Sequence, residues 1–430
     1  MFCYQCEQTS GGVGCVLKVG VCGKNEDISS LQDTLIYGLK GVAAYAYHAR
    51  ELGAKDEEVD AFMHEALFKT LTNVSFNLNQ YIEIVLKCGA INLKVMELLD
   101  KAHTKRFGNP VPTEVDTGTK KGPGILITGH DLLDLEELLK QTEGKGVNIY
   151  THSEMLPAHG YPELKKFKHL AGNYGGAWQE QKKEFGKFSG AILVTTNCVQ
   201  IPAANTYLDR LFTTGISGVE GAEHLARSDF SAVIKKAKSL PPLPDAPGKK
   251  IVTGFHHTAI LGIADKIVSA VKSGKIKRFF LIGGCDGAKP GRNYYTELAE
   301  KASKDCVILT LACGKYRFNK QDFGAIDGIP RLIDIGQCNN AYSAIQVAIA
   351  LSKVSNCSVN ELPLSIILSW FEQKAVAILL TLLNLGIKGI RIGPTAPAFI
   401  SPAVFKIIQD KFDLKLITTP DKDLADILKK

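Results

Sequence analysis

Cysteines are the residues of this 430-residue chain that most clearly predict chemistry, because it contains 11 of them. One glycine-rich stretch near the start has the spacing C-x2-C-x8-C-x6-C and contains Cys3, Cys6, Cys15 and Cys22. A loop of this kind can wrap one compact metal centre, and thiolates bind both zinc and iron–sulfur clusters. A second, redox-active site elsewhere in the chain favours an iron–sulfur electron relay here, with structural zinc as the alternative.

That second site is predicted by metal-capable residues that share one position, directly after a short apolar run. They are His130, Glu154, Cys198, Cys285, Cys313, Cys338 and Glu372. Short apolar runs indicate buried strands, and in open α/β sheets the loops that follow the strands converge in one crevice. Thiolates suit iron and sulfide, whereas imidazole and carboxylate suit oxygen-bridged iron, so the mixed set predicts an unusual redox cluster. Buried cysteine without a ligand is the alternative reading of each thiol.

Several neighbouring residues bear on this site. Glycines flank the thiols in Gly283-Gly284-Cys285-Asp286-Gly287 and would let the backbone approach a cluster closely. We expect His152 and His159 either to orient Glu154 or to be solvated loop residues. His256-His257 follow an apolar run, and adjacent strand residues point to opposite sides, so at most one of them would reach the crevice, as a proton donor. A structural role for both is the alternative.

Composition limits the class of protein. Hydrophobic residues make up 45% of the chain and charged residues 22%, which is typical of soluble globular proteins. The net charge is +7, and the lysines that contribute to it are scattered among glutamates rather than gathered in one run. This pattern gives no support to nucleic-acid binding. The first residues do not resemble a signal peptide, and the longest apolar stretch is too short to cross a membrane. We therefore expect a cytoplasmic protein, where cysteines serve metals more often than disulfides.

The helical part of the chain is expected at residues 27–103. Apolar residues recur there at three to four positions, in a first helix that Ser29-Ser30 precede and Gly53 ends, and in a third from about Leu78 to Leu99 that is interrupted near Gly89. Proline, glycine and charge over residues 107–123 favour extended, solvated chain, so a domain boundary is placed there.

Beyond that boundary short apolar runs alternate with helical patterns, which is typical of α/β domains. Strands are expected at residues 124–128, 147–150, 191–195, 251–253, 278–282, 307–311, 332–335, 364–368 and 390–392. A second proline-rich linker lies at 241–248. The sequence thus predicts a multidomain α and α/β protein: a Cys-rich loop plus helical bundle (1–115), followed by two Rossmann-like α/β domains (116–245 and 246–430).

Taken in order, these motifs resemble the hybrid-cluster protein family, often named hydroxylamine reductase, almost end to end. The resemblance is carried by Met1-Phe2-Cys3-Tyr4-Gln5-Cys6-Glu7-Gln8-Thr9, Thr128-Gly129-His130-Asp131, Thr195-Thr196-Asn197-Cys198, Gly283-Gly284-Cys285-Asp286-Gly287, Leu311-Ala312-Cys313-Gly314-Lys315, Gly336-Gln337-Cys338-Asn339 and Ser369-Trp370-Phe371-Glu372-Gln373-Lys374-Ala375. The helical region is shorter than in the better-studied members and resembles a compact subgroup.

The resemblance implies two clusters and a reaction. A hybrid [4Fe-2O-2S] cluster would be bound by His130, Glu154, Cys198, Cys285, Cys313, Cys338 and Glu372. Cys285 matches a cysteine found as a persulfide, and Lys374 matches a lysine beside that cluster, so Cys285, Glu372 and Lys374 would act in catalysis. Cys3, Cys6, Cys15 and Cys22 match the ligands of a [4Fe-4S] cubane that passes electrons inward. The gap before Cys22 is longer than in the closest family pattern, so a two-iron cluster is the alternative.

The implied activity is reduction of hydroxylamine to ammonia and water, with electrons from an unidentified donor protein. Nitric oxide reduction to nitrous oxide on the same cluster is one alternative. Another is a redox regulator that transfers nitrosyl groups to protein thiols through Cys285, and a third is carbon monoxide dehydrogenase-like chemistry, which would require nickel. Because the shortened helical region frees surface, a homo-oligomer is a further hypothesis.

Overall fold

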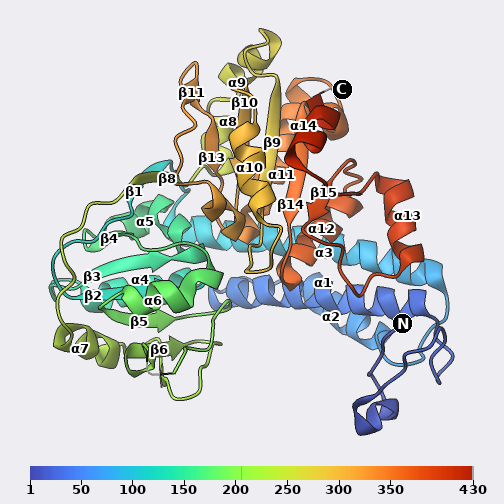
Figure 1. The fold of residues 1–430 in the computed structure, drawn as a ribbon, viewed down its shortest axis with the longest axis horizontal. Coiled ribbons are helices and arrows are strands. Elements are labelled where there is room, and N and C mark those ends of the chain that lie inside the picture. The colour runs from blue at the N-terminus through green and yellow to red at the C-terminus, as the bar shows by residue number, and fades with distance from the viewer. Residues whose placement is uncertain (205, 429–430) are drawn as a thin grey trace. The chain divides into compact units, whose positions relative to one another are not determined.

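The structure is a computed structural model that describes residues 1–204 and 206–428 (Figure 1). The chain divides into two compact units. The first unit comprises Met1–Ala102 and Asn356–Lys430, and the second comprises His103–Ser355. Within residues 1–204 and 206–428, no helix combines the length and apolar character needed to cross a membrane.

The first unit begins with the Cys-rich segment, which contains a short 3₁₀ turn, η1 (Glu7–Gly12). Three helices follow: α1 (Glu26–Glu51), α2 (Glu57–Lys69) and α3 (Leu78–Phe107). The helix α1 begins earlier than expected because the Asn25 side chain caps it, accepting from the Ile28 N–H at 2.9 Å. Its end is as expected: Gly53 has φ +80°, and the N–H groups of Gly53 and Ala54 donate to the last carbonyls of the helix.

The helix α3 passes through Gly89 without a break, contrary to the expected interruption. A Cβ at Gly89 would lie 2.1 Å from the carbonyl oxygen of Leu380, on α12 (Gln373–Asn384). Thr381 fixes this crossing, because its hydroxyl donates to the Gly89 carbonyl at 2.9 Å and accepts from the Asn92 amide at 3.0 Å. The glycine therefore permits a close approach of two helices rather than ending one.

The first unit also contains the C-terminal elements of the chain. The parallel strands β14 (Leu364–Ser369), β15 (Arg391–Gly393) and β16 (Lys415–Leu416) pair in that order. The helices α13 (Pro402–Phe412) and α14 (Pro420–Leu428) and the turn η7 (Val359–Glu361) complete it. Ser401 connects the two ends of the chain, since its hydroxyl donates to Asp27 and its N–H donates to the Ser30 hydroxyl.

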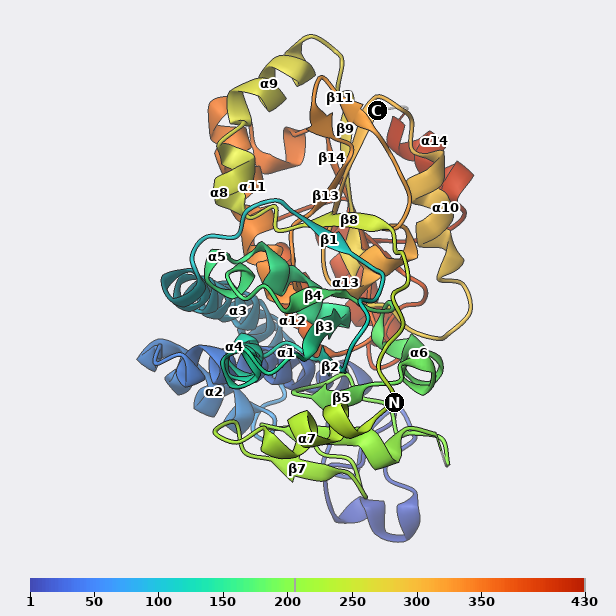
Figure 2. The ribbon, with the colours of Figure 1, turned by 90° about the vertical axis from the view of Figure 1, so that its left-hand side faces the viewer.

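The second unit contains a six-stranded parallel sheet with the order β4-β3-β2-β5-β6-β7 (Figure 2). Its strands are β2 (Gly124–Thr128), β3 (Asn148–His152), β4 (Leu170–Asn173), β5 (Ala191–Val194), β6 (Leu211–Thr214) and β7 (Glu223–Leu225). The connecting helices are α4 (Leu132–Thr142), α5 (Pro162–Lys165), α6 (Gln181–Lys187) and α7 (Ser231–Ser239), with 3₁₀ turns η2 (Ser153–Gly160), η3 (Trp178–Glu180) and η4 (Leu208–Arg210). Apolar residues of β2 and β5 pack with Phe185 and Phe188 in its core.

Three more parallel strands of the second unit pair in the order β13-β10-β9. They are β9 (Arg278–Gly284), β10 (Cys306–Thr310) and β13 (Leu332–Asp334). Around them in sequence are α8 (His257–Leu261), α9 (Ala264–Lys272), α10 (Asn293–Lys301) and α11 (Ala341–Val354), the turns η5 (Cys313–Arg317) and η6 (Cys338–Asn340), and the small hairpin β11 (Ala325–Ile326) and β12 (Ile329–Pro330). The predicted multidomain α/β fold with parallel sheets is confirmed.

One expected linker contains a strand. Residues 107–123 were expected to be solvated, yet β1 (Thr113–Asp116) pairs antiparallel with β8 (Lys250–Thr253). Thr113 and Val115 are buried while Glu114 is exposed, and Val115 packs against Leu156 and Ile251. The short alternation of buried and exposed residues stabilises this strand, although prolines and glycines surround it.

Candidate metal centre

Six of the seven residues predicted to bind a cluster lie in the second unit, each just after a parallel strand. His130 follows β2, Glu154 lies in η2 after β3, and Cys198 follows β5. Cys285 follows β9, Cys313 opens η5 after β10, and Cys338 opens η6 after β13. These loops leave the carboxyl ends of their strands, where ligand sites of open α/β sheets form.

The structure brings three of these residues together from the ends of β2, β3 and β13. Ligand atoms of His130, Glu154 and Cys338 all lie within 4.8 Å of one another, and all three residues are buried. His130 Nε2 is 3.9 Å from Glu154 Oε2, and the backbone N–H of Cys338 donates to that same oxygen at 2.9 Å. An imidazole, a carboxylate and a thiol therefore converge on one small volume.

Cys313 belongs to the same region. The Ser153 hydroxyl, beside Glu154, is 3.3 Å from the Cys313 sulfur. Burial raises the pKa of the Cys313 thiol well above its usual range, and negative charge on Glu154, Cys198 and Cys285 raises it further. Because so many anionic donors meet in a buried place, their ionised forms require a compensating cation.

The hydrogen bonds of His130 assign its tautomer. Its Nδ1 is 3.0 Å from the carbonyl oxygen of Asn197 and 3.0 Å from the Thr196 hydroxyl. A carbonyl can only accept, so Nδ1 carries the proton and Nε2, on the Glu154 side, presents a lone pair. A ring held this way through one nitrogen while the other faces anionic donors is typical of metal-binding histidine.

The donor set fits an iron–sulfur cluster. The thiols suit iron and sulfide, and the buried imidazole and carboxylate suit oxygen-bridged iron. Glycines shape the loops that present them: a Cβ at Gly129, whose φ is +123°, would lie 2.2 Å from the Thr195 hydroxyl. A Cβ at Gly283 would meet the Leu311 backbone at 3.0 Å, so this glycine allows the chain just before Cys285 and the chain just before Cys313 to pack closely.

Glu372 and Lys374 lie in the first unit, at the start of α12. Glu372 caps this helix, and its Oε2 accepts from the Lys374 N–H at 3.3 Å. The Lys374 ammonium is 3.8 Å from Glu372 Oε1, and both side chains are largely buried. Their roles beside the cluster stay predictions.

The N-terminal cysteines lie in an irregular segment of the first unit. Cys3 and Cys15 exchange two backbone hydrogen bonds, of 3.0 and 2.8 Å, as an isolated antiparallel pair. Residues paired in this way carry their side chains on the same face, so the two sulfurs lie on one side. Cys22 is close to the turn between α2 and α3, with its sulfur 3.8 Å from the Thr72 carbonyl oxygen. No disulfide joins any of the eleven cysteines, all of which the structure describes.

The histidines that flank Glu154 serve other partners than expected. The two ring nitrogens of His152 are 3.1 Å from the Thr128 hydroxyl and 2.9 Å from Glu184. His159 Nε2 is 3.0 Å from the Thr151 hydroxyl, and burial lowers the pKa of His159 to about 4. The expectation that His152 orients Glu154 is wrong, since both of its nitrogens are committed elsewhere.

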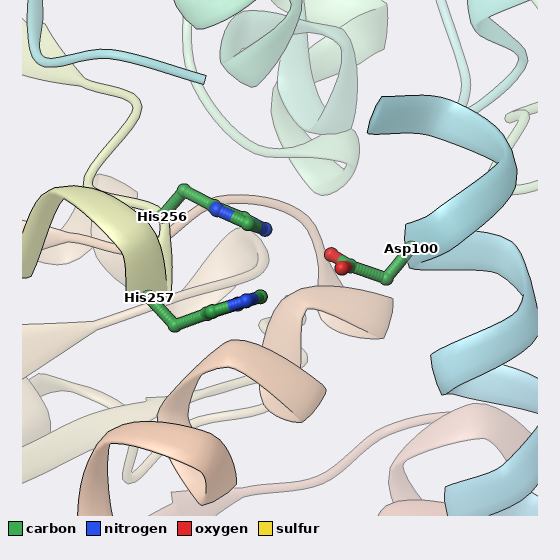
Figure 3. Close-up of side chains that lie close together, drawn as sticks. All are labelled: Asp100, His256 and His257. Atoms are coloured by element: carbon green, nitrogen blue, oxygen red, sulfur yellow. The ribbon is translucent and has the colours of Figure 1, made fainter. Parts of the chain in front are cut away.

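His256 and His257 lie side by side rather than pointing to opposite sides. Their ring centroids are 3.8 Å apart. Figure 3 shows the two side chains next to each other. The chain turns from β8 into α8 at this point and so loses the alternation of a strand. His256 Nδ1 is 2.9 Å from the Thr258 hydroxyl, and His257 Nδ1 is 3.0 Å from the Ser343 hydroxyl. These bonds support the structural role for the pair.

Two buried glutamines hold the loops that carry predicted ligands, and the sequence analysis missed both. Gln337 donates to the carbonyl oxygens of Glu154 at 2.7 Å and His130 at 3.2 Å. Gln181, on α6, donates to the Cys198 carbonyl oxygen at 2.7 Å. The position of Gln337 directly before a predicted ligand was a usable signal, whereas nothing in the sequence marks Gln181.

Comparison of the sequence with known proteins supports the predicted family. Residues 1–83 and 52–425 match the Prismane/CO dehydrogenase family. Hydroxylamine reductase from Moorella thermoacetica is 70% identical over 428 residues, which cover 100% of both chains. Hydroxylamine reductase from Geobacter metallireducens is 61% identical over 398 residues, which are 93% of this chain and 72% of that relative. The relative from Moorella thermoacetica is therefore as short as this chain, whereas the relative from Geobacter metallireducens is longer.

The fold is also similar to solved structures. Carbon Monoxide Dehydrogenase IV from Carboxydothermus hydrogenoformans matches with a TM-score of 0.79 over 99% of this chain and 91% of that chain. At 16% sequence identity this likeness concerns the fold alone. The family match over nearly the whole length, the two relatives and the strand-end donor set agree, and the resemblance predicted from the motifs is confirmed: the chain belongs to the Prismane/CO dehydrogenase family.

Proposed function

We propose that this protein is an iron–sulfur oxidoreductase that reduces hydroxylamine, consuming two electrons and two protons and releasing ammonia and water. The observation that carries the proposal is the convergence of buried His130, Glu154 and Cys338, with Cys313 nearby. The relatives named hydroxylamine reductase, one of them 70% identical, support the choice of substrate.

The strand-end residues would hold the hybrid [4Fe-2O-2S] cluster. His130 would bind through Nε2, Glu154 through its carboxylate, and Cys198, Cys285, Cys313 and Cys338 through sulfur, with Glu372 as the seventh ligand. When bound, this cluster would supply a Lewis acid and the site of electron transfer for cleavage of the N–O bond. The near-complete burial of Glu154 and Cys313 keeps water from competing there.

Residues beside the ligands would handle charge and protons. Lys374 would stabilise negative charge that develops on the substrate, and its ammonium 3.8 Å from the proposed ligand Glu372 supports this role. Ammonia and water as products require protons from a donor at the site edge, for which a histidine or carboxylate is chemically suitable. Cys285, which matches the persulfide-forming cysteine of the family, would be the reactive sulfur.

Electrons would enter through a [4Fe-4S] cluster held by Cys3, Cys6, Cys15 and Cys22. Partial exposure of Cys6, Cys15 and Cys22 supports this role, because a donor protein must come close to the relay. Large apolar side chains of the same segment are exposed, among them Phe2, Tyr4, Leu17 and Val21. Exposed apolar side chains of this kind could contact a donor protein. We also propose that the chain forms a homo-oligomer through surface that its short helical region leaves free. A monomeric mass by light scattering at working concentration would contradict this last proposal.

The first experiment measures iron and acid-labile sulfide per chain after anaerobic purification. We expect about eight iron atoms in the unchanged protein and about four in a Cys285→Ser/Cys313→Ser variant, which keeps the N-terminal cluster. A Cys88→Ser/Cys357→Ser variant is the matched control, since neither residue is a proposed ligand, and should keep the full iron content. Zinc in place of iron, or iron unaffected by the first variant, would overturn the assignment.

Product analysis then tests the reaction. With a reduced viologen as electron source, we expect one ammonia per two electrons consumed when hydroxylamine is supplied. Nitrous oxide formed faster from nitric oxide would favour the alternative reductase, and nitrosyl transfer to protein thiols without sustained turnover would favour the regulator. Full activity in a preparation without nickel would exclude carbon monoxide dehydrogenase-like chemistry as its basis.

A further inference from the structure

Gln337 lies directly before Cys338 and is 2% exposed. Its side-chain amide nitrogen donates to two carbonyl oxygens, that of Glu154 at 2.7 Å and that of His130 at 3.2 Å. Its own backbone N–H donates to Asn340 Oδ1 at 2.8 Å, which fixes the start of η6. One buried side chain therefore uses both amide hydrogens to reach the main chain of two other proposed ligands.

These bonds join the end of β13 to the ends of β2 and β3, which lie far earlier in the sequence. His130 follows β2, Glu154 follows β3, and Gln337 itself follows β13. A hydrogen bond to a residue's own carbonyl fixes its backbone, and hence the point from which its side chain reaches the metal. Buried carbonyls that lost this donor would have to shift or stay unsatisfied.

The turn that presents Gln337 is itself rigid. Gly336 has φ +140°, and a Cβ there would lie 2.3 Å from Asn340 Oδ1, the atom that accepts from the Gln337 N–H. The Gly336 carbonyl accepts from the buried ammonium of Lys315 at 2.8 Å, on the neighbouring ligand-bearing turn η5. The backbone around Gln337 is thus fixed by Asn340 and Lys315, while its side-chain amide binds the loops of His130 and Glu154.

We infer that Gln337 is a positioning residue that sets the mutual placement of His130, Glu154 and Cys338 for binding the cluster. The inference rests on the metal-binding part of the proposed function but not on the identity of the substrate. Partners that orient metal ligands typically change metal affinity or activity by 10- to 100-fold when removed. A hydrogen bond that served only loop stability would lower the unfolding temperature without changing the cluster.

Two variants remove the amide donors in different ways. Gln337→Met keeps the length of the side chain and removes its polar atoms. Gln337→Glu keeps the shape but sets a carboxylate, which when ionised can only accept, against two carbonyl oxygens. The matched control is Gln141→Met in the same unit, because Gln141 also bonds two main-chain groups, the Arg227 carbonyl at 3.0 Å and the Phe230 N–H at 2.7 Å, on residues that are not proposed ligands.

The test compares iron content, the electron paramagnetic resonance spectrum and the rate at which a chelator removes iron, all after anaerobic purification. For both Gln337 variants we expect an unchanged signal from the N-terminal cluster, a shifted signal from the strand-end cluster, and release of its iron about 10- to 100-fold faster. The Gln141→Met protein should match the unchanged protein. If Gln337→Met does not fold, the spectrum of Gln337→Glu decides alone.

Wild-type spectrum and release rate in a folded Gln337 variant would overturn the inference, as would equal shifts in the Gln141 control. Failure of the proposed reaction is distinguishable. Unchanged protein that holds both clusters but leaves hydroxylamine untouched refutes the reaction and leaves the Gln337 test intact. Unchanged protein without a strand-end cluster refutes both.

Discussion

The backbone N–H of Cys338 donates to Oε2 of Glu154 at 2.9 Å, so one proposed ligand orients the carboxylate of another. Glu154→Gln keeps an oxygen that can accept this bond but removes the negative charge. We expect the strand-end cluster to be lost or incomplete, because a neutral amide is a weak iron ligand. Iron analysis measures the change. The control is Glu136→Gln, which removes a carboxylate that pairs with Arg106 and is not a proposed ligand. It should leave the iron content unchanged.

Thr196 is expected to support His130. Its hydroxyl accepts from the His130 N–H at 2.9 Å and lies 3.0 Å from His130 Nδ1. In Thr196→Val both contacts are lost while shape is conserved, so iron release from the strand-end cluster should be about tenfold faster. Thr213→Val is the control, since Thr213 pairs with His224 at 3.1 Å on the same sheet and holds no proposed ligand. Equal release rates in the two variants would contradict the role of Thr196.

Two glycines in helices should respond to alanine in opposite directions. In Gly89→Ala the new Cβ meets the Leu380 carbonyl oxygen at 2.1 Å, so α3 and α12 must separate, and we expect a loss of about 2 kcal/mol or more in the free energy of unfolding. In Gly186→Ala, on α6, the Cβ meets nothing within 4 Å, and the higher helix propensity of alanine should add up to about 1 kcal/mol. Chemical denaturation measures both. A stabilised Gly89→Ala protein would show that the helices are not in such close contact.

The pKa of His159, lowered by burial from 6.5 to about 4, predicts how stability depends on pH. Between these values the unfolded chain binds a proton that the folded protein does not, so stability is complete above pH 6.5 and falls as the pH decreases toward 4. The loss amounts to about 3 kcal/mol over that range.

Denaturation at pH 6.5 and pH 4.5 in the unchanged protein and in His159→Gln measures this contribution. The variant should lose less stability on acidification than the unchanged protein. His64→Gln, a substitution at an exposed histidine of α2, should behave as the unchanged protein does. Identical pH dependence in the His159→Gln protein would show that another group carries the effect.

Local pattern was enough to predict the position of many strands and of the N-terminal helices. The strand at Gly124–Thr128 follows from its apolar run, and His130, Cys285 and Cys338 were placed after strands by the same reasoning. Parallel strands end at one edge of a sheet, so residues after successive strands were expected to meet. His130 and Glu154 follow neighbouring strands of one sheet and agree with this logic, whereas Cys338 follows β13 of another sheet and joins them only through the tertiary structure.

Contacts between residues distant in sequence determined the features that the local sequence pattern did not predict. The sequence pattern predicted a helix interruption at Gly89, but the residue lies where two helices cross. Only the fold brings the Leu380 carbonyl close to it. The strand β1 exists because β8, more than a hundred residues later, pairs with it. Gln337 looks like an ordinary polar residue until the fold sets two carbonyls before its amide.

The sequence by itself determined which residues can bind iron and at which strand ends they lie, since residue type and short-range periodicity are local properties. Only the tertiary structure decided which side chains hold those residues in place. Hydrogen-bond partners such as Gln337 and His130 are distant along the chain, and their pairing depends on the order in which the strands are arranged in the fold. That order is an outcome of packing the whole core, which no short stretch of sequence encodes.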